Sequence, residues 1–191
     1  MKNIIVLNGI HGSGKTTLAE AFAAANEGYK FFPEIGGQLR QKVAYNVLER
    51  RDDFDLAVME REIARHQELL RCAETPVVET WHVGNLAYVL ARSPRLFDRY
   101  KAAFELQRDL FNPLVFLITI DWPTFRRRAT EKIRPQQMVE LQGFYQHIID
   151  NTRLLYESLG IPFLEVSNNN GVGDALATIR RNVFSQVARA G

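Results

Sequence analysis

The stretch Gly9-Ile10-His11-Gly12-Ser13-Gly14-Lys15-Thr16 lies close to the start of the chain. It matches the pattern G-x-x-x-x-G-K-[ST], a glycine-rich loop whose backbone N–H groups surround a polyphosphate. An apolar run, residues 3–7, precedes the loop, and residues 15–25, rich in Ala and Leu, follow it. A strand, a tight turn and a helix in this order place the positive helix N-terminus beside the phosphates. The stretch therefore predicts a nucleoside triphosphate site.

The side chains of this loop have separate predicted roles. Lys15 supplies a cation for the β- and γ-phosphates, and the Thr16 hydroxyl is a ligand for Mg²⁺. The sequence contains no Asn-Lys-x-Asp run of the kind that selects guanine, so ATP or a loosely selected nucleotide is expected. The residues predicted to bind ATP are Gly9, His11, Gly12, Ser13, Gly14, Lys15, Thr16 and Thr17.

The composition favours one globular domain, residues 1–191, in a cytoplasmic setting. The 24 basic and 22 acidic residues leave a net charge of +2, which does not favour nucleic acid as the main partner. The single cysteine, Cys72, excludes an internal disulfide and a cysteine-rich zinc site. The longest apolar runs are too short to span a membrane, and the first residues turn polar too soon for a signal peptide.

Short apolar runs alternate with helical patterns along the chain. Runs that are apolar throughout are typical of strands buried on both faces of a parallel sheet. Alternating strands and helices predict right-handed crossovers and a three-layer α/β/α fold. The expected strands are residues 3–7, 29–32, 76–78, 114–120 and 161–166, and the expected helices are residues 15–25, 38–50, 54–72, 125–132, 136–159 and 172–188.

With this loop and this order of elements, the chain resembles the P-loop nucleoside and nucleotide kinases. It is most similar to the thymidylate kinase and deoxynucleoside kinase group. The resemblance implies a five-stranded parallel sheet in the order 2-3-1-4-5 and an arginine-rich lid at about residues 122–140. It also implies transfer of the γ-phosphate of ATP, with Mg²⁺, to a nucleoside or nucleotide.

The segment Phe32-Pro33-Glu34-Ile35-Gly36-Gly37-Gln38-Leu39-Arg40 resembles the acidic, glycine-containing loop that follows the second strand in these kinases. The resemblance implies that Glu34 faces the acceptor hydroxyl, where a carboxylate can accept the proton as transfer begins. Arg40 can hold an acceptor phosphate or another anion. Alternatively, Glu34 is an acidic residue at a helix N-terminus, stabilised by the helix dipole.

The segment Val77-Val78-Glu79-Thr80-Trp81-His82 ends an expected strand beside the strand of the phosphate loop. Relatives have an acid–arginine pair here, so the resemblance implies that Glu79 lies near Mg²⁺, together with Thr16, or acts as the base. Thr80 stands where the relatives have arginine. The indole of Trp81 can stack on the acceptor or pack in the core, and the sequence leaves both open.

The predicted lid helix follows the strand at 114–120. Asp121 is expected to start this helix, which carries several arginines and is followed by Arg134. Guanidinium groups over the phosphates would stabilise the charge of the transferring group. Arg128 and Arg134 match the family spacing best, and the alternative is a solvated basic face. The predicted catalytic residues are Lys15, Glu34, Glu79, Arg128 and Arg134.

The leading hypothesis is an ATP-dependent kinase of a small molecule, with a nucleoside or nucleoside monophosphate as the acceptor. Two alternatives stay open, namely a regulatory ATPase without an acceptor and a kinase of a non-nucleotide metabolite. A kinase of nucleic-acid ends is disfavoured by the near-neutral charge. The expected partner is the small-molecule acceptor, and a homodimer is left open.

Overall fold

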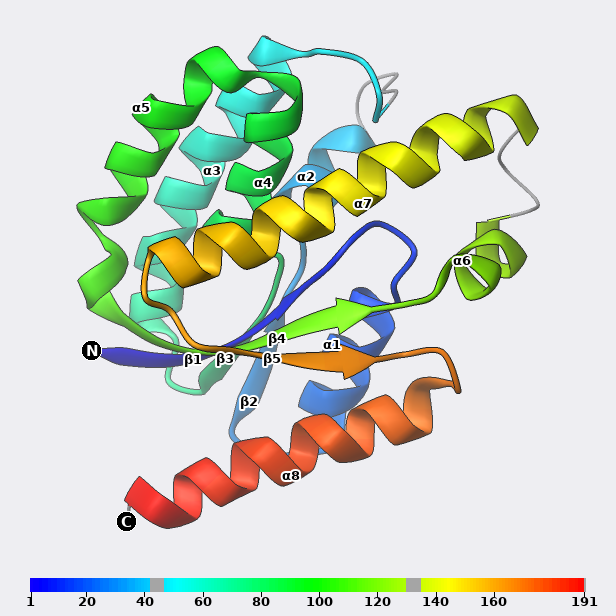
Figure 1. The fold of residues 1–191 in the computed structure, drawn as a ribbon. Coiled ribbons are helices and arrows are strands. Elements are labelled where there is room, and N and C mark those ends of the chain that lie inside the picture. The colour runs from blue at the N-terminus through cyan, green and yellow to red at the C-terminus, as the bar shows by residue number, and fades with distance from the viewer. Residues whose placement is uncertain (42–46, 130–134, 191) are drawn as a thin grey trace.

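Five parallel strands form the central sheet of the computed structural model, which describes residues 1–41, 47–129 and 135–190 (Figure 1). The strand order is β2-β3-β1-β4-β5, as predicted. Because the strands are parallel, the loops that follow β1, β2, β3 and β4 all start at the same edge of the sheet. The strands are β1 (Lys2–Asn8), β2 (Tyr29–Phe32), β3 (Thr75–Glu79), β4 (Phe111–Thr119) and β5 (Phe163–Ser167).

The strand β1 lies at the centre because its residues from Ile4 to Leu7 are buried on both faces. It pairs with β3 on one side and with β4 on the other. The register places Leu7 opposite Glu79, so the phosphate loop and the end of β3 leave the sheet side by side. In parallel sheets this carboxyl edge is where ligands bind.

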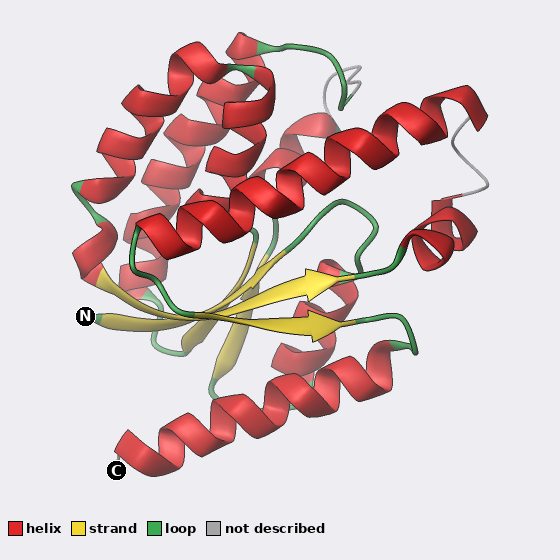
Figure 2. Ribbon diagram, viewed as in Figure 1, coloured by secondary structure: helices red, strands yellow, loops and turns green. Residues whose placement is uncertain are grey.

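Helices cover both faces of the sheet (Figure 2). One face is covered by α1 (Lys15–Ala24) and α8 (Val172–Ala190), where Phe22 and Ile179 lie in one apolar cluster. The other face is covered by α3 (Asp52–Arg71), α4 (His82–Arg92), α5 (Pro94–Glu105) and α7 (Pro135–Ser158). Burial of each large apolar side chain in these clusters contributes about 1.5–3 kcal/mol. Of the helices in the described ranges, none combines the length and the apolar character needed to cross a membrane.

Three short helices complete the fold. α2 (Ile35–Arg40) follows β2, α6 (Trp122–Ala129) follows β4, and the 3₁₀ helix η1 (Arg108–Leu110) precedes β4. The helix predicted at residues 38–50 is wrong at its start, because Pro33 and the extended backbone of Glu34 begin α2 at Ile35. It is also wrong at its end, since α2 stops at Arg40 and residues 47–50 are not helical, while residues 42–46 lie outside the described residues.

Two helices, α4 and α5, were not predicted from the sequence. Most of α4 is buried, including its polar residues His82 and Asn85, and Gly84 and Asn85 in its first turn have low helix propensity. The helix α5 begins with Pro94, which fits a first helical turn, where no N–H is needed. These two helices supply much of the packing behind the end of β3.

Candidate active site

A cavity of about 740 Å³ lies at the carboxyl edge of the sheet. The phosphate loop forms one side of it, and the segment after β2 forms another. The residues that line it are His11, Gly12, Gly14, Lys15, Thr16, Thr17, Pro33, Glu34, Gly37, Gln38, Arg40, Gln41, Glu79, Arg128, Asn168 and Val172. Six of the eight residues predicted to bind ATP are among them, whereas Gly9 and Ser13 are not.

At Gly9 and Gly14 the phosphate loop needs glycine both for its backbone angle and for lack of space. Gly9 has φ +147° and Gly14 has φ +92°, values that other residues rarely adopt. A Cβ atom at Gly9 would collide with the carbonyl oxygen of Ile118, and one at Gly14 would collide with the Asn168 amide. The loop therefore needs glycine for its conformation and also for its close contact with β4 and the loop after β5.

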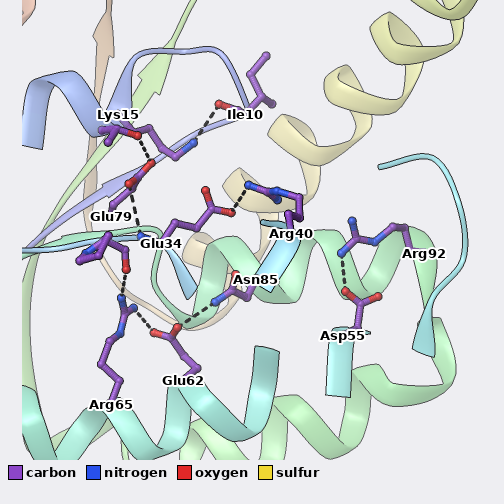
Figure 3. Close-up of polar contacts among 12 residues, drawn as sticks. Ile10, Lys15, Glu34, Arg40, Asp55, Glu62, Arg65, Glu79, Asn85 and Arg92 are labelled. Carbon is purple, nitrogen blue, oxygen red and sulfur yellow. Dashed lines mark hydrogen bonds and ion pairs between the residues drawn. The ribbon is translucent and has the colours of Figure 1, made fainter. Parts of the chain in front are cut away.

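Lys15 and Thr16 begin α1 directly after the loop. The Lys15 side chain is buried, and its Nζ donates a hydrogen bond of 3.1 Å to the Ile10 carbonyl, so it lies back along the loop (Figure 3). Thr16 Oγ1 donates a hydrogen bond of 2.6 Å to Glu79 Oε1. The cation and the hydroxyl predicted for phosphate and Mg²⁺ thus lie at one end of the cavity.

Glu79 joins the phosphate loop to the segment after β2. Its Oε1 accepts the Thr16 hydroxyl, and its Oε2 accepts the backbone N–H of Glu34 at 3.4 Å. A carboxylate and a hydroxyl in contact at the edge of a cavity suit Mg²⁺, which prefers oxygen ligands and often uses few protein ligands together with substrate phosphates. Thr16 and Glu79 therefore fit the metal that the sequence predicts.

Glu34 and Arg40 line the same cavity as Lys15. Arg40 Nη2 is 3.2 Å from Glu34 Oε1, and the side chains are 24% and 14% exposed. Burial acts to raise the pKa of Glu34, but the charges of Lys15 and Arg40 outweigh it, so this pKa lies below its ordinary value. Glu34 is therefore ionised at neutral pH, as a proton acceptor must be.

Arg128 contacts the phosphate loop from α6. Its Nη2 donates to the Asn168 carbonyl at 2.7 Å, and its Nη1 donates to the Ser13 carbonyl at 3.4 Å. Asn168 Nδ2 also donates to the Ser13 carbonyl, at 2.8 Å. Arg128 thus lines the cavity while holding together the phosphate loop and the loop after β5. The other predicted lid arginine, Arg134, lies outside the described residues.

The structure also places two further residues that the sequence analysis discusses, Asp121 and Trp81. Asp121 accepts the Thr124 N–H at 2.7 Å and so caps α6, as expected. Trp81 is fully buried and packs edge to face on Phe104, with ring centres 5.2 Å apart. Of the two alternatives that the sequence leaves open for Trp81, this burial favours packing of the indole in the core. Its partner Phe104 belongs to α5, a helix that the sequence did not predict.

A buried polar network behind the cavity was missed by the sequence analysis (Figure 3). Arg65 Nη1 donates to the Pro33 carbonyl and Nη2 to the Thr80 carbonyl, both at 2.9 Å. Arg65 also forms an ion pair with Glu62, which accepts a 3.3 Å hydrogen bond from Asn85. Burial raises the pKa of Glu62, and the Arg65 charge opposes this effect. The one sequence signal was a pair of opposite charges spaced i,i+3 within the predicted helix at residues 54–72.

Comparison with known proteins shows the family to which the chain belongs. A family model described as an AAA domain matches residues 4–172. No curated protein matches the chain significantly in sequence.

Several solved structures share the fold. Thymidylate kinase from Candida albicans has a TM-score of 0.67 and 12% identity over 97% of this chain and 92% of its own. Thymidylate kinase from Ehrlichia chaffeensis has a TM-score of 0.63 and 14% identity over 96% and 100%. Deoxyadenosine kinase from M. mycoides, solved with dCMP and dCDP bound, has a TM-score of 0.64 and 14% identity over 97% and 100%. The chain therefore belongs to this AAA-domain family and has the fold of the P-loop nucleoside and nucleotide kinases.

Proposed function

We propose that the protein is an ATP-dependent phosphotransferase that moves the γ-phosphate of ATP to a nucleoside or a nucleoside monophosphate. The observation that carries this proposal is that one cavity is lined both by the phosphate loop and by the segment containing Glu34 and Arg40. A phosphate donor and an acceptor can meet in such a cavity without bulk water between them. The fold shared with thymidylate and deoxyadenosine kinases supports the same class of acceptor.

The donor half of the cavity is the phosphate loop. Its N–H groups and the start of α1 would hold the polyphosphate, and Lys15 would turn from the Ile10 carbonyl to the β- and γ-phosphate oxygens. Thr16 and Glu79 would hold Mg²⁺, which when bound neutralises part of the phosphate charge. Because phosphoryl transfer depends mainly on positioning and electrostatics, these groups account for most of the expected catalysis.

The acceptor half is the segment from Pro33 to Gln41. Glu34 is ionised and borders the cavity, so it can accept the proton of an acceptor hydroxyl as the oxygen attacks the γ-phosphate. The 3.2 Å contact with Arg40 orients the Glu34 carboxylate. The same guanidinium is the cation beside which an anionic group of the acceptor would bind. Arg128 also lines the cavity, and its contact with the Ser13 carbonyl would hold the phosphate loop in place for the donor.

The test is transfer of label from [γ-³²P]ATP with Mg²⁺ to panels of nucleosides, nucleoside monophosphates and non-nucleotide alcohols. The proposal predicts a labelled product only with members of the first two panels, and loss of that product in Glu34→Gln. Labelled product from the third panel alone would identify a kinase of a non-nucleotide metabolite. Phosphate release that no acceptor changes would replace the proposal by a regulatory ATPase.

A further inference from the structure

We propose that Arg65 is a positioning residue that fixes Glu34 and Glu79 relative to each other. This inference rests on the proposed function, in which both carboxylates act on one reaction. Arg65 lies on α3 behind the cavity, and its guanidinium does not line the cavity. It therefore acts through the backbone of the two segments that carry the carboxylates.

Two peptide groups are held at both of their ends. The peptide between Pro33 and Glu34 accepts from Arg65 at its carbonyl and donates to Glu79 Oε2 at its N–H. The peptide between Thr80 and Trp81 accepts from Arg65 at its carbonyl and donates to Asn8 Oδ1 at its N–H, at 3.1 Å. A closed ring of hydrogen bonds and covalent bonds thus runs from Arg65 through Glu34 and Glu79 and back to Arg65.

The ring passes through backbone that would not hold this conformation alone. Thr80 has φ +51°, which lies in the left-handed region. For a residue with a branched Cβ this conformation has a free-energy cost of order 1 kcal/mol or more. Strain of this kind persists only where the surroundings fix it, and the hydrogen bond from Arg65 fixes the Thr80 carbonyl. Arg65 therefore holds a turn that aims Glu79 at Thr16.

A guanidinium suits this task and an ammonium group does not. The buried fork of Arg65 reaches two carbonyls from separate segments and also pairs with Glu62. Asn85 holds the second oxygen of Glu62, so the acid that orients Arg65 is itself oriented from α4. Lysine at this position would keep the charge but could not present fixed donors in three directions.

The experiment compares Arg65→Lys with Arg61→Lys, a matched change one turn earlier on the exposed side of α3. For Arg65→Lys we expect kcat to fall by up to about 10²-fold, as a misplacement near 1 Å can cause, with a much smaller change in the KM for ATP. Arg61→Lys should match the wild type in both. In a Glu34→Gln background, where the residual rate is measured in single turnovers with excess enzyme, Arg65→Lys should have a smaller effect than in the wild type, because only the placement of Glu79 can still be disturbed. Full additivity of the two changes, or an equal loss in both lysine variants, would overturn the proposal.

A second measurement tests the inference independently of enzyme activity. Hydrogen exchange of the amides of Glu34 and Trp81 should accelerate in Arg65→Lys, while exchange in α8 should stay at the wild-type rate. Unchanged exchange at both amides would overturn the positioning role even if the kinase reaction is found. If the wild type transfers no label to any acceptor, the proposed function fails, and the exchange data alone then test whether Arg65 holds the two segments. Should Arg65→Lys not fold, the charge-free double variant Glu62→Gln/Arg65→Gln replaces it in both measurements.

Discussion

Thr16 Oγ1 donates a 2.6 Å hydrogen bond to Glu79 Oε1, and this contact joins the first turn of α1 to the end of β3. The register that places Leu7 opposite Glu79 brings the two residues together, although they lie 63 positions apart in the sequence. A hydroxyl on a carboxylate at this place gives two adjacent oxygen ligands for a divalent ion. The contact therefore links the sheet topology to the proposed use of Mg²⁺.

Replacing Glu79 by glutamine tests this pair of ligands. The amide oxygen can still accept the Thr16 hydroxyl, but the negative charge is lost. We expect the Mg²⁺ concentration that gives half-maximal activity to rise by about 10- to 100-fold. Glu74→Gln, at an exposed carboxylate just before β3, is the control and should leave the Mg²⁺ dependence unchanged. Equal Mg²⁺ titrations for Glu79→Gln and the wild type would remove Glu79 from the metal site.

Lys15→Ala is expected to abolish most of the transfer. Lys15 is the cation that begins the helix after the phosphate loop, and loss of one stabilising group at a transferring phosphate should cost at least about 10²-fold in kcat. Initial rates with [γ-³²P]ATP measure this loss, and thermal unfolding checks that the variant folds. Lys30→Ala, at an exposed lysine on β2, should keep the wild-type rate. Unchanged turnover in Lys15→Ala would exclude the phosphate loop from the mechanism.

Tyr156→Phe is expected to destabilise the fold through Asn8. The Asn8 amide donates to the Tyr156 hydroxyl, and its carbonyl oxygen accepts the Trp81 N–H. Both side chains are buried, so removing the hydroxyl leaves a buried N–H group without its acceptor. The free energy of unfolding should fall by about 1–3 kcal/mol, measured by urea denaturation. A loss below about 0.5 kcal/mol, the range of neutral surface changes, would mean that this hydrogen bond does not stabilise β1 against α7.

The buried pair His66 and His82 should make stability depend on pH. Their Nε2 atoms are 2.6 Å apart, and burial lowers the pKa of both rings, that of His82 most strongly. The unfolded chain therefore binds more protons than the folded chain once the pH falls below about 6.5. Between pH 6.5 and 5.5 the free energy of unfolding should fall with the pH, by at most about 2.7 kcal/mol for two protons.

Urea denaturation at both pH values measures this loss. His82→Gln, whose amide can take the place of Nε2, should reduce the loss, whereas His147→Gln, at an exposed histidine on α7, should preserve it. If the wild type is equally stable at pH 6.5 and 5.5, the two rings do not resist protonation in the folded state.

Local patterns in the sequence were enough to predict much of the fold. The phosphate loop was predictable because its glycines and Lys15 lie close together in the sequence and need no distant partner to be recognised. The strand β1 was predictable because burial on both faces gives an unbroken apolar run. Glu34 and Glu79 were predicted because the segments that carry them, each after an expected strand, resemble the corresponding segments of the P-loop kinases. In contrast, α4 was not predicted, because Gly84 and Asn85 in its first turn have low helix propensity and the burial of the helix is decided by its neighbours in the fold.

Contacts between distant segments were beyond the sequence. Trp81 follows the end of a strand, and its side chain packs on Phe104 of α5. The hydrophobic pattern of the sequence did not reveal this helix. Arg65 looks like an ordinary charged residue on a helix until the fold places the Pro33 and Thr80 carbonyls within its reach. The contacts of Arg128 with Ser13 and Asn168 likewise depend on how α6 and the loop after β5 meet the phosphate loop.

Calorimetric titration of the intact protein with ATP and Mg²⁺ tests the central claim most directly. The account predicts saturable heat with one nucleotide bound per chain, a weaker response without Mg²⁺, and loss of the heat in Lys15→Ala. The absence of heat at millimolar concentrations of ATP and other purine triphosphates would contradict the claim that this loop binds a nucleotide.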